Sequence, residues 1–349
     1  MARVLVTGGA GFIGSHVVDA VVDHGHEVLV LDARDPALGN PMAEYVRGDV
    51  TDPATVERCV DGVDAVSHQA AMVGLGVDFE DVADYVRAND LGTAVLLKEL
   101  ARKAFRGRLV LASSMVVYGE GRYRCPKDGV VQPGPRPERR LAAGCFEPPC
   151  PECGRDLVPE PVPESTPADP RNVYAATKVH QEHLCAAFGR ERGVPVVALR
   201  YHNVYGPRMP RDTPYAGVAA IFRSALERAE PPQVFEDGRQ LRDFVHVRDV
   251  ARANVVALIE GATGAFNVAS GEPHTIEEMA SALHGAFGIG EPPPIVTGRF
   301  RLGDVRHVFA SPDRAARVLG FRAQIPFDQG MRELASAEFS LQPASAARP

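Results

Sequence analysis

The sequence predicts an α/β fold: a doubly wound parallel sheet with a smaller mixed α/β domain after it. Three observations lead to this prediction. Apolar runs of strand length alternate with helical patterns through the first 200 residues, a glycine-rich loop joins the first run to the first helix, and a stretch rich in proline and cysteine interrupts the series. Such alternation implies right-handed crossovers, which place the strands parallel in one sheet.

The elements can be placed in order along the chain. Apolar runs predict strands at 4–7, 28–32, 45–47, 65–68, 109–113 and 196–200. Helical spacing predicts helices at 15–23, 85–104 and 172–192, and then at 216–229, 249–259, 275–287 and 312–319. We therefore expect a nucleotide-binding domain over 1–120 and 164–200 and a mainly substrate-binding domain over 201–340. Part of that second domain can return to the first sheet.

Composition excludes several classes of protein. The chain has 349 residues, of which 45% are hydrophobic, so it can bury a sizeable core. A net charge of -7 without a long basic run excludes the electrostatic footprint of a nucleic-acid binder. No apolar stretch approaches the ~20 residues of a membrane span, and a strand-like run opens the fold at once. We expect a cytoplasmic protein with no membrane partner.

The glycine-rich loop has the sequence TGGAGFIG at residues 7–14. Gly8, Gly11 and Gly14 permit a tight turn, close approach to a pyrophosphate and close packing of the helix on the strand. The helix that follows offers free N–H groups to the phosphates. A glycine motif alone can be a mere turn, but here it lies between a strand and a helix. The spacing therefore predicts a dinucleotide site on a Rossmann domain.

Acidic residues after the next strands indicate which dinucleotide binds. Asp32 closes the second strand at the distance expected of a ribose-binding carboxylate. A carboxylate there repels a 2′-phosphate, which favours NAD, although Arg34 keeps NADP open. Asp49 and Val50 follow the third strand and would lie along the adenine, but a turn role for Asp49 is equally consistent with its position.

A tyrosine and a lysine on one predicted helix carry the candidate chemistry. Tyr174 and Lys178 are four residues apart and therefore share a helix face. A free tyrosine has a pKa of about 10, and a neighbouring lysine and an oxidised nicotinamide both favour its phenolate. This spacing arises by chance in most helices. It gains weight because Ser113 and Ser114 end the fifth strand, where parallel sheets place their ligands.

These motifs and several others, in order, resemble those of the extended short-chain dehydrogenase/reductases, in the branch of nucleotide-sugar epimerases and dehydratases. The motifs are residues 8–14 (GGAGFIG), 48–50 (GDV), 68–71 (HQAA), 89 with 92–93 (N, GT), 113–119 (SSMVVYG), 174–178 (YAATK), 200–207 (RYHNVYGP) and 242–247 (RDFVHV). The resemblance covers nearly the whole chain apart from 121–163.

The resemblance implies a role for each matching residue. Ser114 is expected to bond the reacting sugar oxygen, Tyr174 to act as acid and base, and Lys178 to orient the nicotinamide ribose. The cofactor site implied is Gly8, Gly11, Phe12, Ile13, Gly14, Asp32, Asp49, Val50, Ala70 and Asn89, together with Tyr174 and Lys178. For the nucleotide sugar, the implied residues are Asn203 on the diphosphate, Arg242, Arg301 and Asp304 as a clamp, and Val234 and Phe235 against the pyrimidine. For the arginines, a solvated face is the alternative.

A departure from the family pattern disfavours dehydration among the reactions of this branch. Dehydratases of this branch follow the serine or threonine with an Asp-Glu pair, whereas this chain has Met115 and Val116 there. The resemblance therefore implies a 4-epimerase that acts on a UDP- or dTDP-hexose through a transient 4-keto sugar. A 4-ketoreductase, a decarboxylase and a non-catalytic NAD-binding sensor or scaffold remain alternatives. Family members commonly form homodimers through two helices, here 85–104 and 172–192.

The stretch 121–163 contains four cysteines and ten prolines, so we expect neither helix nor central strand in it. Cys150 and Cys153 form a metal-binding knuckle. A structural zinc site is expected on Cys125, Cys150 and Cys153, with Cys145 or Asp128 as the fourth ligand; reduced thiols in a loop are the alternative. Similar insertions occur in some epimerases of dTDP-deoxyhexoses, which favours a substrate such as dTDP-rhamnose.

Overall fold

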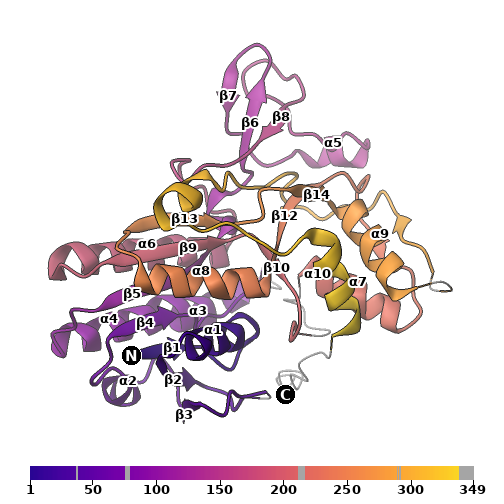
Figure 1. The fold of residues 1–349 in the computed structure, drawn as a ribbon. Helices are drawn as coiled ribbons and strands as arrows, with labels where there is room; N and C mark the ends of the chain where they lie inside the picture. Colours follow the sequence, from indigo (N-terminus) through magenta and orange to yellow (C-terminus); the bar gives the residue numbers. More distant parts are fainter. Residues whose placement is uncertain (37, 75–78, 211–216, 289, 291, 338–349) are drawn as a thin grey trace.

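A seven-stranded parallel sheet forms the centre of the protein (Figure 1). The structure, a computed structural model, describes all residues except 37, 75–78, 211–216, 289, 291 and 338–349. The strand order is β13-β9-β5-β4-β1-β2-β3, and every neighbouring pair is parallel. The strands are β1 (Arg3–Thr7), β2 (Glu27–Asp32), β3 (Ala43–Arg47), β4 (Ala65–His68), β5 (Arg108–Ser114), β9 (Val196–Tyr201) and β13 (Gly264–Val268). The predicted doubly wound fold is confirmed.

Helices cover both faces of this sheet, which explains why its strands are almost continuously apolar. They are α1 (Phe12–Asp23), α2 (Pro53–Cys59), α4 (Gly92–Arg102), α6 (Val173–Arg192) and α8 (Val247–Ile259). On β1, Val4 and Val6 pack in the cluster that contains residues of α1 and α8. Leu5 points the other way, into the cluster with residues of α2, α4 and α6. Adjacent residues of one strand thus bury opposite faces.

The helix expected over 85–104 is interrupted. It consists of α3 (Val82–Tyr85), a π-helical turn η2 (Val86–Leu91) and then α4. In this wider turn the Asn89 carbonyl accepts hydrogen bonds from Thr93 Oγ1 at 2.7 Å and Gln181 Nε2 at 3.2 Å. Single π turns of this kind are frequent at functional sites. A second π turn, η4 (Ala315–Leu319), stands in the region 312–319 expected to be helical.

The second half of the chain builds a smaller unit beside the carboxyl ends of the strands (Figure 1). It contains the sheets β10-β12-β14 and β11-β15. Their strands are β10 (Asn203–Tyr205), β11 (Gln233–Val234), β12 (Leu241–His246), β14 (Pro273–Thr275) and β15 (Ile295–Val296). Its helices are α7 (Val218–Glu227), α9 (Ile276–Phe287) and α10 (Phe327–Ser336), and residue 216 of the helix expected over 216–229 lies outside the described residues. From this half, β13 returns to the central sheet.

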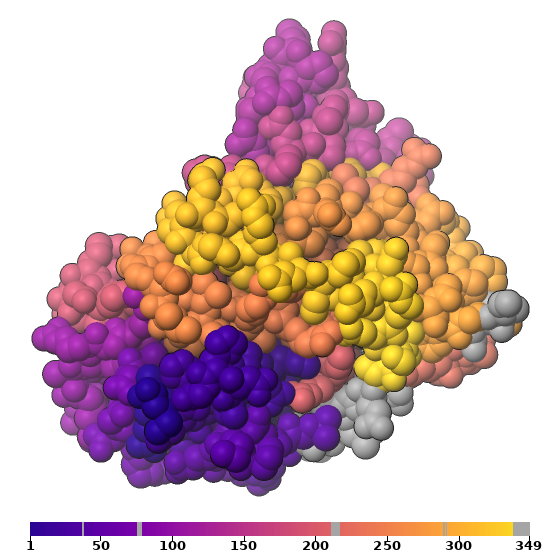
Figure 2. Space-filling model, in the orientation of Figure 1, coloured from indigo at the N-terminus to yellow at the C-terminus, as the bar shows by residue number. Residues whose placement is uncertain are grey.

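Residues 121–163 form a lobe that projects from the rest of the molecule (Figures 1 and 2). The lobe contains β6 (Arg122–Cys125), β7 (Gly129–Val131), α5 (Glu138–Ala142) and β8 (Val158–Glu160), with β6 central in an antiparallel sheet. The expectation of no helix and no central strand is therefore wrong. The prolines avoid the interior of β6 and α5; Pro137 precedes α5, and Pro159 lies on the edge strand β8.

None of the helices in the described part of the chain combines the length and the apolar character needed to cross a membrane.

Candidate functional site

The glycine loop between β1 and α1 has no room for side chains. Gly8 has φ +72°, and a Cβ atom added there would lie 2.6 Å from the Ala70 nitrogen. A Cβ atom on Gly14 would lie 2.1 Å from the Gly8 carbonyl oxygen. Gly11 precedes α1 and has no side chain to cap it, so the first-turn N–H groups at Phe12 and Ile13 face outward from the helix end. This loop is shaped to receive a phosphate group closely.

Asp32 lies at the end of β2, beside the same loop. Its carboxylate accepts hydrogen bonds from the Ala10 nitrogen at 3.0 Å and the Arg34 nitrogen at 2.9 Å. The Arg34 guanidinium pairs with it at 3.7 Å. A carboxylate fixed in this way retains acceptor capacity for a ribose diol. Asp49 is exposed and accepts from the Thr51 nitrogen at 2.8 Å, so the turn role left open by the sequence is present.

A buried chain of hydrogen bonds runs from the glycine loop to α6. Thr7 Oγ1 lies 2.7 Å from His68 Nδ1, and His68 Nε2 lies 2.9 Å from Thr93 Oγ1. Burial lowers the pKa of His68 to about 3, so the ring is neutral. Because Thr93 donates to the Asn89 carbonyl, its oxygen accepts from His68, which places the ring proton on Nε2. Thr7 in turn accepts from the Ala70 nitrogen at 3.2 Å.

Asn89 extends this chain to α6. Its side-chain amide donates to Thr177 Oγ1 at 2.9 Å and to the Met72 carbonyl at 3.0 Å, and its oxygen accepts from the Met72 nitrogen at 2.8 Å. Thr177 precedes Lys178 on α6. Ala70 and Asn89, both expected in the cofactor site, therefore belong to one network. The sequence motifs at 68–71 (HQAA) and at 89 with 92–93 (N, GT) contain several members of this network. The roles of Thr7, Thr93 and Thr177 were not predicted from the sequence.

Ser114, Tyr174 and Lys178 come together where β5 ends against α6. The Lys178 ammonium donates to the Ala112 carbonyl at 3.0 Å and lies 5.8 Å from the centre of the Tyr174 ring. Burial raises the pKa of Tyr174 to about 12, and a side-chain hydrogen bond with Ser114 acts in the opposite direction. Burial also lowers the pKa of Lys178 to about 8. In the polypeptide alone the tyrosine is thus an acid, and an added positive charge near its ring favours the phenolate.

The two serines at the end of β5 have different partners. Ser113 donates to the Glu182 carboxylate, and Arg200 holds the same carboxylate at 2.7 and 2.9 Å. Arg200 also donates to the Tyr118 hydroxyl at 2.9 Å. Ser113 is therefore part of a buried structural network, whereas Ser114 faces Tyr174. The role of Ser114 as the catalytic serine stays a prediction, and Ser114 is the serine of the two that has a hydrogen bond with Tyr174.

Several residues expected to bind the nucleotide sugar meet in the second half of the chain. The guanidinium carbons of Arg299 and Arg301 lie 4.9 and 5.0 Å from the centre of the Phe235 ring. Arg242 donates to the carbonyls of residues 241, 305 and 306 at 2.7 to 2.8 Å. Burial raises the pKa of Asp304, and Arg301 and Arg242 oppose that shift. Phe235, Arg242, Arg301 and Asp304 thus lie in one cluster.

Asn203 and Val234 have other surroundings in the structure. Asn203 Oδ1 is buried without a hydrogen-bond partner among the described residues, so it is available to a ligand. Val234 is fully buried in an apolar cluster, and its carbonyl accepts from the Thr297 nitrogen at 2.9 Å. Val234 thus pairs with β15 on one side of β11, and the contact of Val234 and Phe235 with the pyrimidine stays a prediction.

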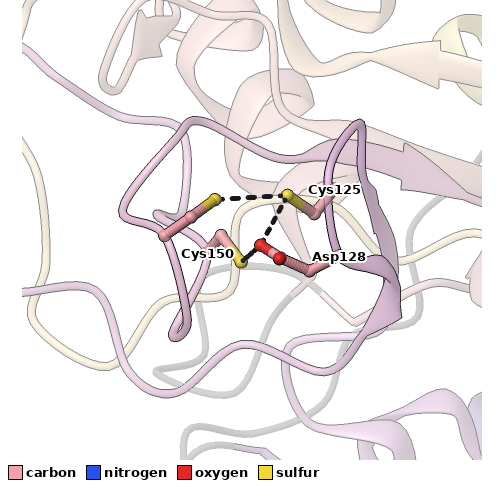
Figure 3. A group of neighbouring side chains, drawn as sticks. Cys125, Asp128 and Cys150 are labelled. Atoms are coloured by element: carbon pink, nitrogen blue, oxygen red, sulfur yellow. Dashed lines mark hydrogen bonds between the residues drawn. The ribbon is translucent and has the colours of Figure 1, made fainter.

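Four residues of the lobe form a compact group of potential metal ligands (Figure 3). The ligand atoms of Cys125, Asp128, Cys150 and Cys153 all lie within 4.8 Å of one another. Asp128 Oδ2 lies 3.2 Å from the sulfurs of both Cys125 and Cys150. Cys145 is exposed and outside this group, so its assignment as a ligand is corrected in favour of Asp128. Three thiolates and one carboxylate suit a tetrahedral zinc ion.

Comparison with known proteins gives a consistent result. The family described as "NAD dependent epimerase/dehydratase family" matches residues 4–140 and 151–269. The chain is 32% identical over 346 residues to a dTDP-L-rhamnose 4-epimerase of Burkholderia thailandensis, covering 95% of this chain and 93% of that protein. It is 31% identical over 338 residues to a putative UDP-glucose 4-epimerase of Methanocaldococcus jannaschii, with 95% and 96% covered.

Solved structures agree in fold. The UDP-glucose 4-epimerase of Thermus thermophilus in complex with NAD superposes with a TM-score of 0.75 at 33% identity, covering 95% of this chain and 97% of that one. The UDP-glucose 4-epimerase of Thermotoga maritima with UDP-glucose gives a TM-score of 0.79 at 29% identity, with the same coverage of 95% and 97%.

The glycine loop yields a direct prediction. Gly8→Ala should abolish retention of NAD, because the new methyl group meets the Ala70 backbone at 2.6 Å. Gly25→Ala is the matched control: Gly25 has φ +78° but nothing within 4 Å of the added methyl group, so it should cost about 1 to 2 kcal/mol of stability and keep the cofactor. The measurements are the dinucleotide released on denaturation and the melting temperature. Equal NAD content in both variants would contradict the assignment of this loop.

Proposed function

Because this chain belongs to the NAD-dependent epimerase/dehydratase family, we propose that it is an NAD-dependent nucleotide-sugar 4-epimerase. The observation that carries the proposal is the convergence of Ser114, Tyr174 and Lys178 at the end of β5, against α6. Met115 and Val116 follow the serine, so no carboxyl pair is present there to eliminate water. An epimerase needs only the three polar side chains and the cofactor.

The residues present fit NAD. The side-chain-free surface at Gly8 and Gly14 would take the pyrophosphate, and Asp32 would accept hydrogen bonds from the adenosine ribose. The Asp32 carboxylate would repel a 2′-phosphate, which supports NAD over NADP. When bound there, NAD would supply the hydride acceptor and donor for C4 of the sugar.

The polypeptide supplies the proton chemistry. Ser114 would hold the C4 oxygen of the sugar, and Tyr174 would remove its proton and later return it. Burial alone keeps Tyr174 protonated, with a pKa raised to about 12, so its use as a base requires positive charge nearby. Lys178 contributes part of that charge, since its ammonium lies 5.8 Å from the ring centre. Both side chains are in place, which argues against a non-catalytic NAD-binding sensor.

We propose a dTDP-6-deoxyhexose such as dTDP-rhamnose as the substrate, with a UDP-hexose as the alternative. The likeness to a dTDP-L-rhamnose 4-epimerase extends over 95% of the chain. Phe235 with Arg299 and Arg301 would contact the nucleotide base, and Arg242, Asp304 and Asn203 would lie near the ribose and diphosphate.

The reaction is tested by proton NMR of the purified enzyme without added cofactor. The enzyme is incubated separately with dTDP-rhamnose, dTDP-glucose, UDP-glucose and UDP-glucuronate. We expect a product inverted at C4 from dTDP-rhamnose. Inversion of UDP-glucose alone would retain the reaction and replace the substrate. Reaction only on a 4-keto sugar with added NAD(P)H would replace the epimerase by a ketoreductase, and loss of carbon dioxide from UDP-glucuronate would indicate a decarboxylase.

Removal of one hydroxyl tests the mechanism. Tyr174→Phe should lower kcat by about 10²- to 10⁴-fold, the usual contribution of a general acid–base group, and leave bound NAD unchanged. Ser113→Ala serves as a control at the same strand end, because Ser113 bonds Glu182 instead of facing Tyr174. Turnover by Tyr174→Phe close to the wild-type rate would exclude Tyr174 as the acid and base.

We also propose that the lobe binds one structural zinc ion through Cys125, Asp128, Cys150 and Cys153. A lobe with a buried core of few residues gains stability from a closed tetrahedral site.

Metal analysis of the reduced protein should find one zinc per chain. Cys145→Ser should keep it, whereas Asp128→Ala and Cys150→Ser should lower zinc content and melting temperature together. A zinc-free wild type would remove the site, and zinc loss in Cys145→Ser would restore Cys145 as a ligand.

We further propose a homodimer formed through the helical segments 82–102 and 173–192. The apolar side chains of Val86 and Leu91 are 45% and 44% exposed on the first of these segments, which supports burial against a second copy.

A further inference from the structure

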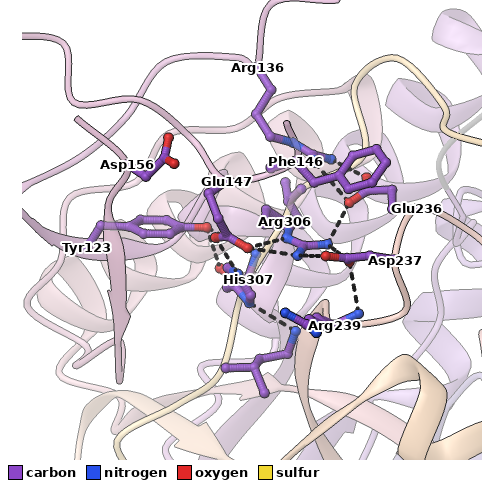
Figure 4. A network of polar contacts seen from close by, with 12 residues as sticks. Tyr123, Arg136, Phe146, Glu147, Asp156, Glu236, Asp237, Arg239, Arg306 and His307 are labelled. Carbon is purple, nitrogen blue, oxygen red and sulfur yellow. Dashed lines mark hydrogen bonds and ion pairs between the residues drawn. The ribbon is translucent and has the colours of Figure 1, made fainter. Parts of the chain in front are cut away.

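A buried ionic network joins the lobe to the second half of the chain (Figure 4). Arg136 comes from the lobe, and its side chain is 2% exposed. Its guanidinium makes a two-pronged contact with Glu236, at 2.7 and 3.0 Å to the two carboxylate oxygens. It also donates to the Asp304 carbonyl at 2.7 Å. One lobe residue thus holds both segments that contain candidate nucleotide-binding residues.

Arg306 completes the network on the other side of Glu236. It is the largest fully buried side chain in the described part of the chain. It contacts Glu236 at 2.8 Å, Asp237 at 2.7 Å and Glu147 of the lobe at 2.7 Å. Glu147 also bonds His307 at 2.9 Å. Each of the two buried guanidinium groups of Arg136 and Arg306 thus has a carboxylate partner, and the three carboxylates leave one excess negative charge.

The network holds an unfavourable backbone conformation at Glu236. Glu236 has φ +53° and is buried, a conformation that is unfavourable for a residue with a side chain. Such strain persists only where surrounding contacts fix the residue. The contacts are those of Arg136 and Arg306, together with a backbone bond from the Glu236 nitrogen to the Arg299 carbonyl at 2.7 Å. This turn sets the direction of Phe235, the preceding residue, towards Arg299 and Arg301.

We propose that the lobe positions the nucleotide-recognition segments 234–237 and 301–306, with Arg136 as the principal positioning residue. This inference rests on the proposed function, which assigns Phe235, Arg242 and Asp304 to the nucleotide sugar. Arg136 fixes the turn at Glu236 and the carbonyl of Asp304. Arg242 bonds the carbonyls of Val305 and Arg306, next to Asp304. Loss of the Arg136 contact therefore displaces the aromatic ring and the clamp together.

The candidate metal site lies close to the same contacts. Tyr123 and Cys125 share β6, and the Tyr123 hydroxyl accepts from the His307 nitrogen at 3.0 Å. Glu147 precedes Cys150 by three residues. The group of ligands thus constrains the two lobe segments that contact the second half of the chain. This arrangement gives the lobe a role in substrate binding at a distance from the reacting atoms.

The test compares nucleotide affinity with turnover. The variants are Arg136→Lys, which keeps the charge but loses the two-pronged contact, and Glu236→Gln, which keeps the shape but loses the charge. Arg139→Ala is the matched control, because Arg139 lies in the same lobe and is exposed. Isothermal titration of dTDP and of UDP into the NAD-loaded enzymes gives Kd, and steady-state rates on the substrate found by NMR give KM and kcat.

We expect Kd and KM to rise roughly tenfold or more in Arg136→Lys and Glu236→Gln, with kcat within about twofold of wild type and NAD content unchanged. Arg139→Ala should match the wild type. Folded Arg136→Lys and Glu236→Gln variants with unchanged Kd would overturn the inference, as would a fall in kcat without a change in Kd. A wild type that binds neither dTDP nor UDP would instead overturn the proposed function, and the inference with it.

Discussion

The buried hydrogen-bond chain Thr7–His68–Thr93–Asn89–Thr177 is the constraint on which the site depends. It joins β1, β4, α4 and α6 at the carboxyl edge of the sheet. Every link has one donor and one acceptor when His68 is neutral, and burial keeps it neutral by lowering its pKa to about 3. A charged ring would leave Thr7 facing a second donor in a dry interior, where an unmatched polar group is costly. The glycine loop and α6 are therefore held in a fixed relative position.

The same network fixes the positions of Tyr174 and Lys178 on α6. Thr177 is one residue before Lys178 and also donates to the Tyr174 carbonyl at 2.8 Å, so the network determines where both side chains stand. Burial then acts on them in opposite directions: it raises the pKa of Tyr174 to about 12 and lowers that of Lys178 to about 8. The protein thus moves the two values apart, so Tyr174 keeps its proton until additional positive charge near its ring favours the phenolate.

Much of the fold and of the candidate site could be predicted from sequence, because these parts depend on local patterns. Continuous apolar runs predicted the parallel strands. The four-residue spacing of Tyr174 and Lys178 predicted that both side chains lie on one face of a helix. The π turn at Asn89, the pairing of Val234 with β15 and the exposure of Cys145 depend on contacts distant in sequence. The Arg136–Glu236 pair spans 100 residues, and neither residue lies in a motif. The central strand β6 was not predicted, because the prolines of 121–163 were taken to exclude a central strand throughout that segment. A proline disrupts a strand only at the position that it occupies, and β6 contains none.

The proposed mechanism requires that the hydrogen removed from C4 be the one returned to it, with NAD as the hydride carrier and Tyr174 moving the proton. The most direct measurement uses a dTDP- or UDP-sugar deuterated at C4, mixed with an unlabelled sugar of different mass, without added cofactor and in ordinary water. We expect a C4-inverted product that keeps its deuterium, with no transfer of label between the two sugars. Loss of deuterium to water, or no conversion until reduced cofactor is supplied, would contradict it.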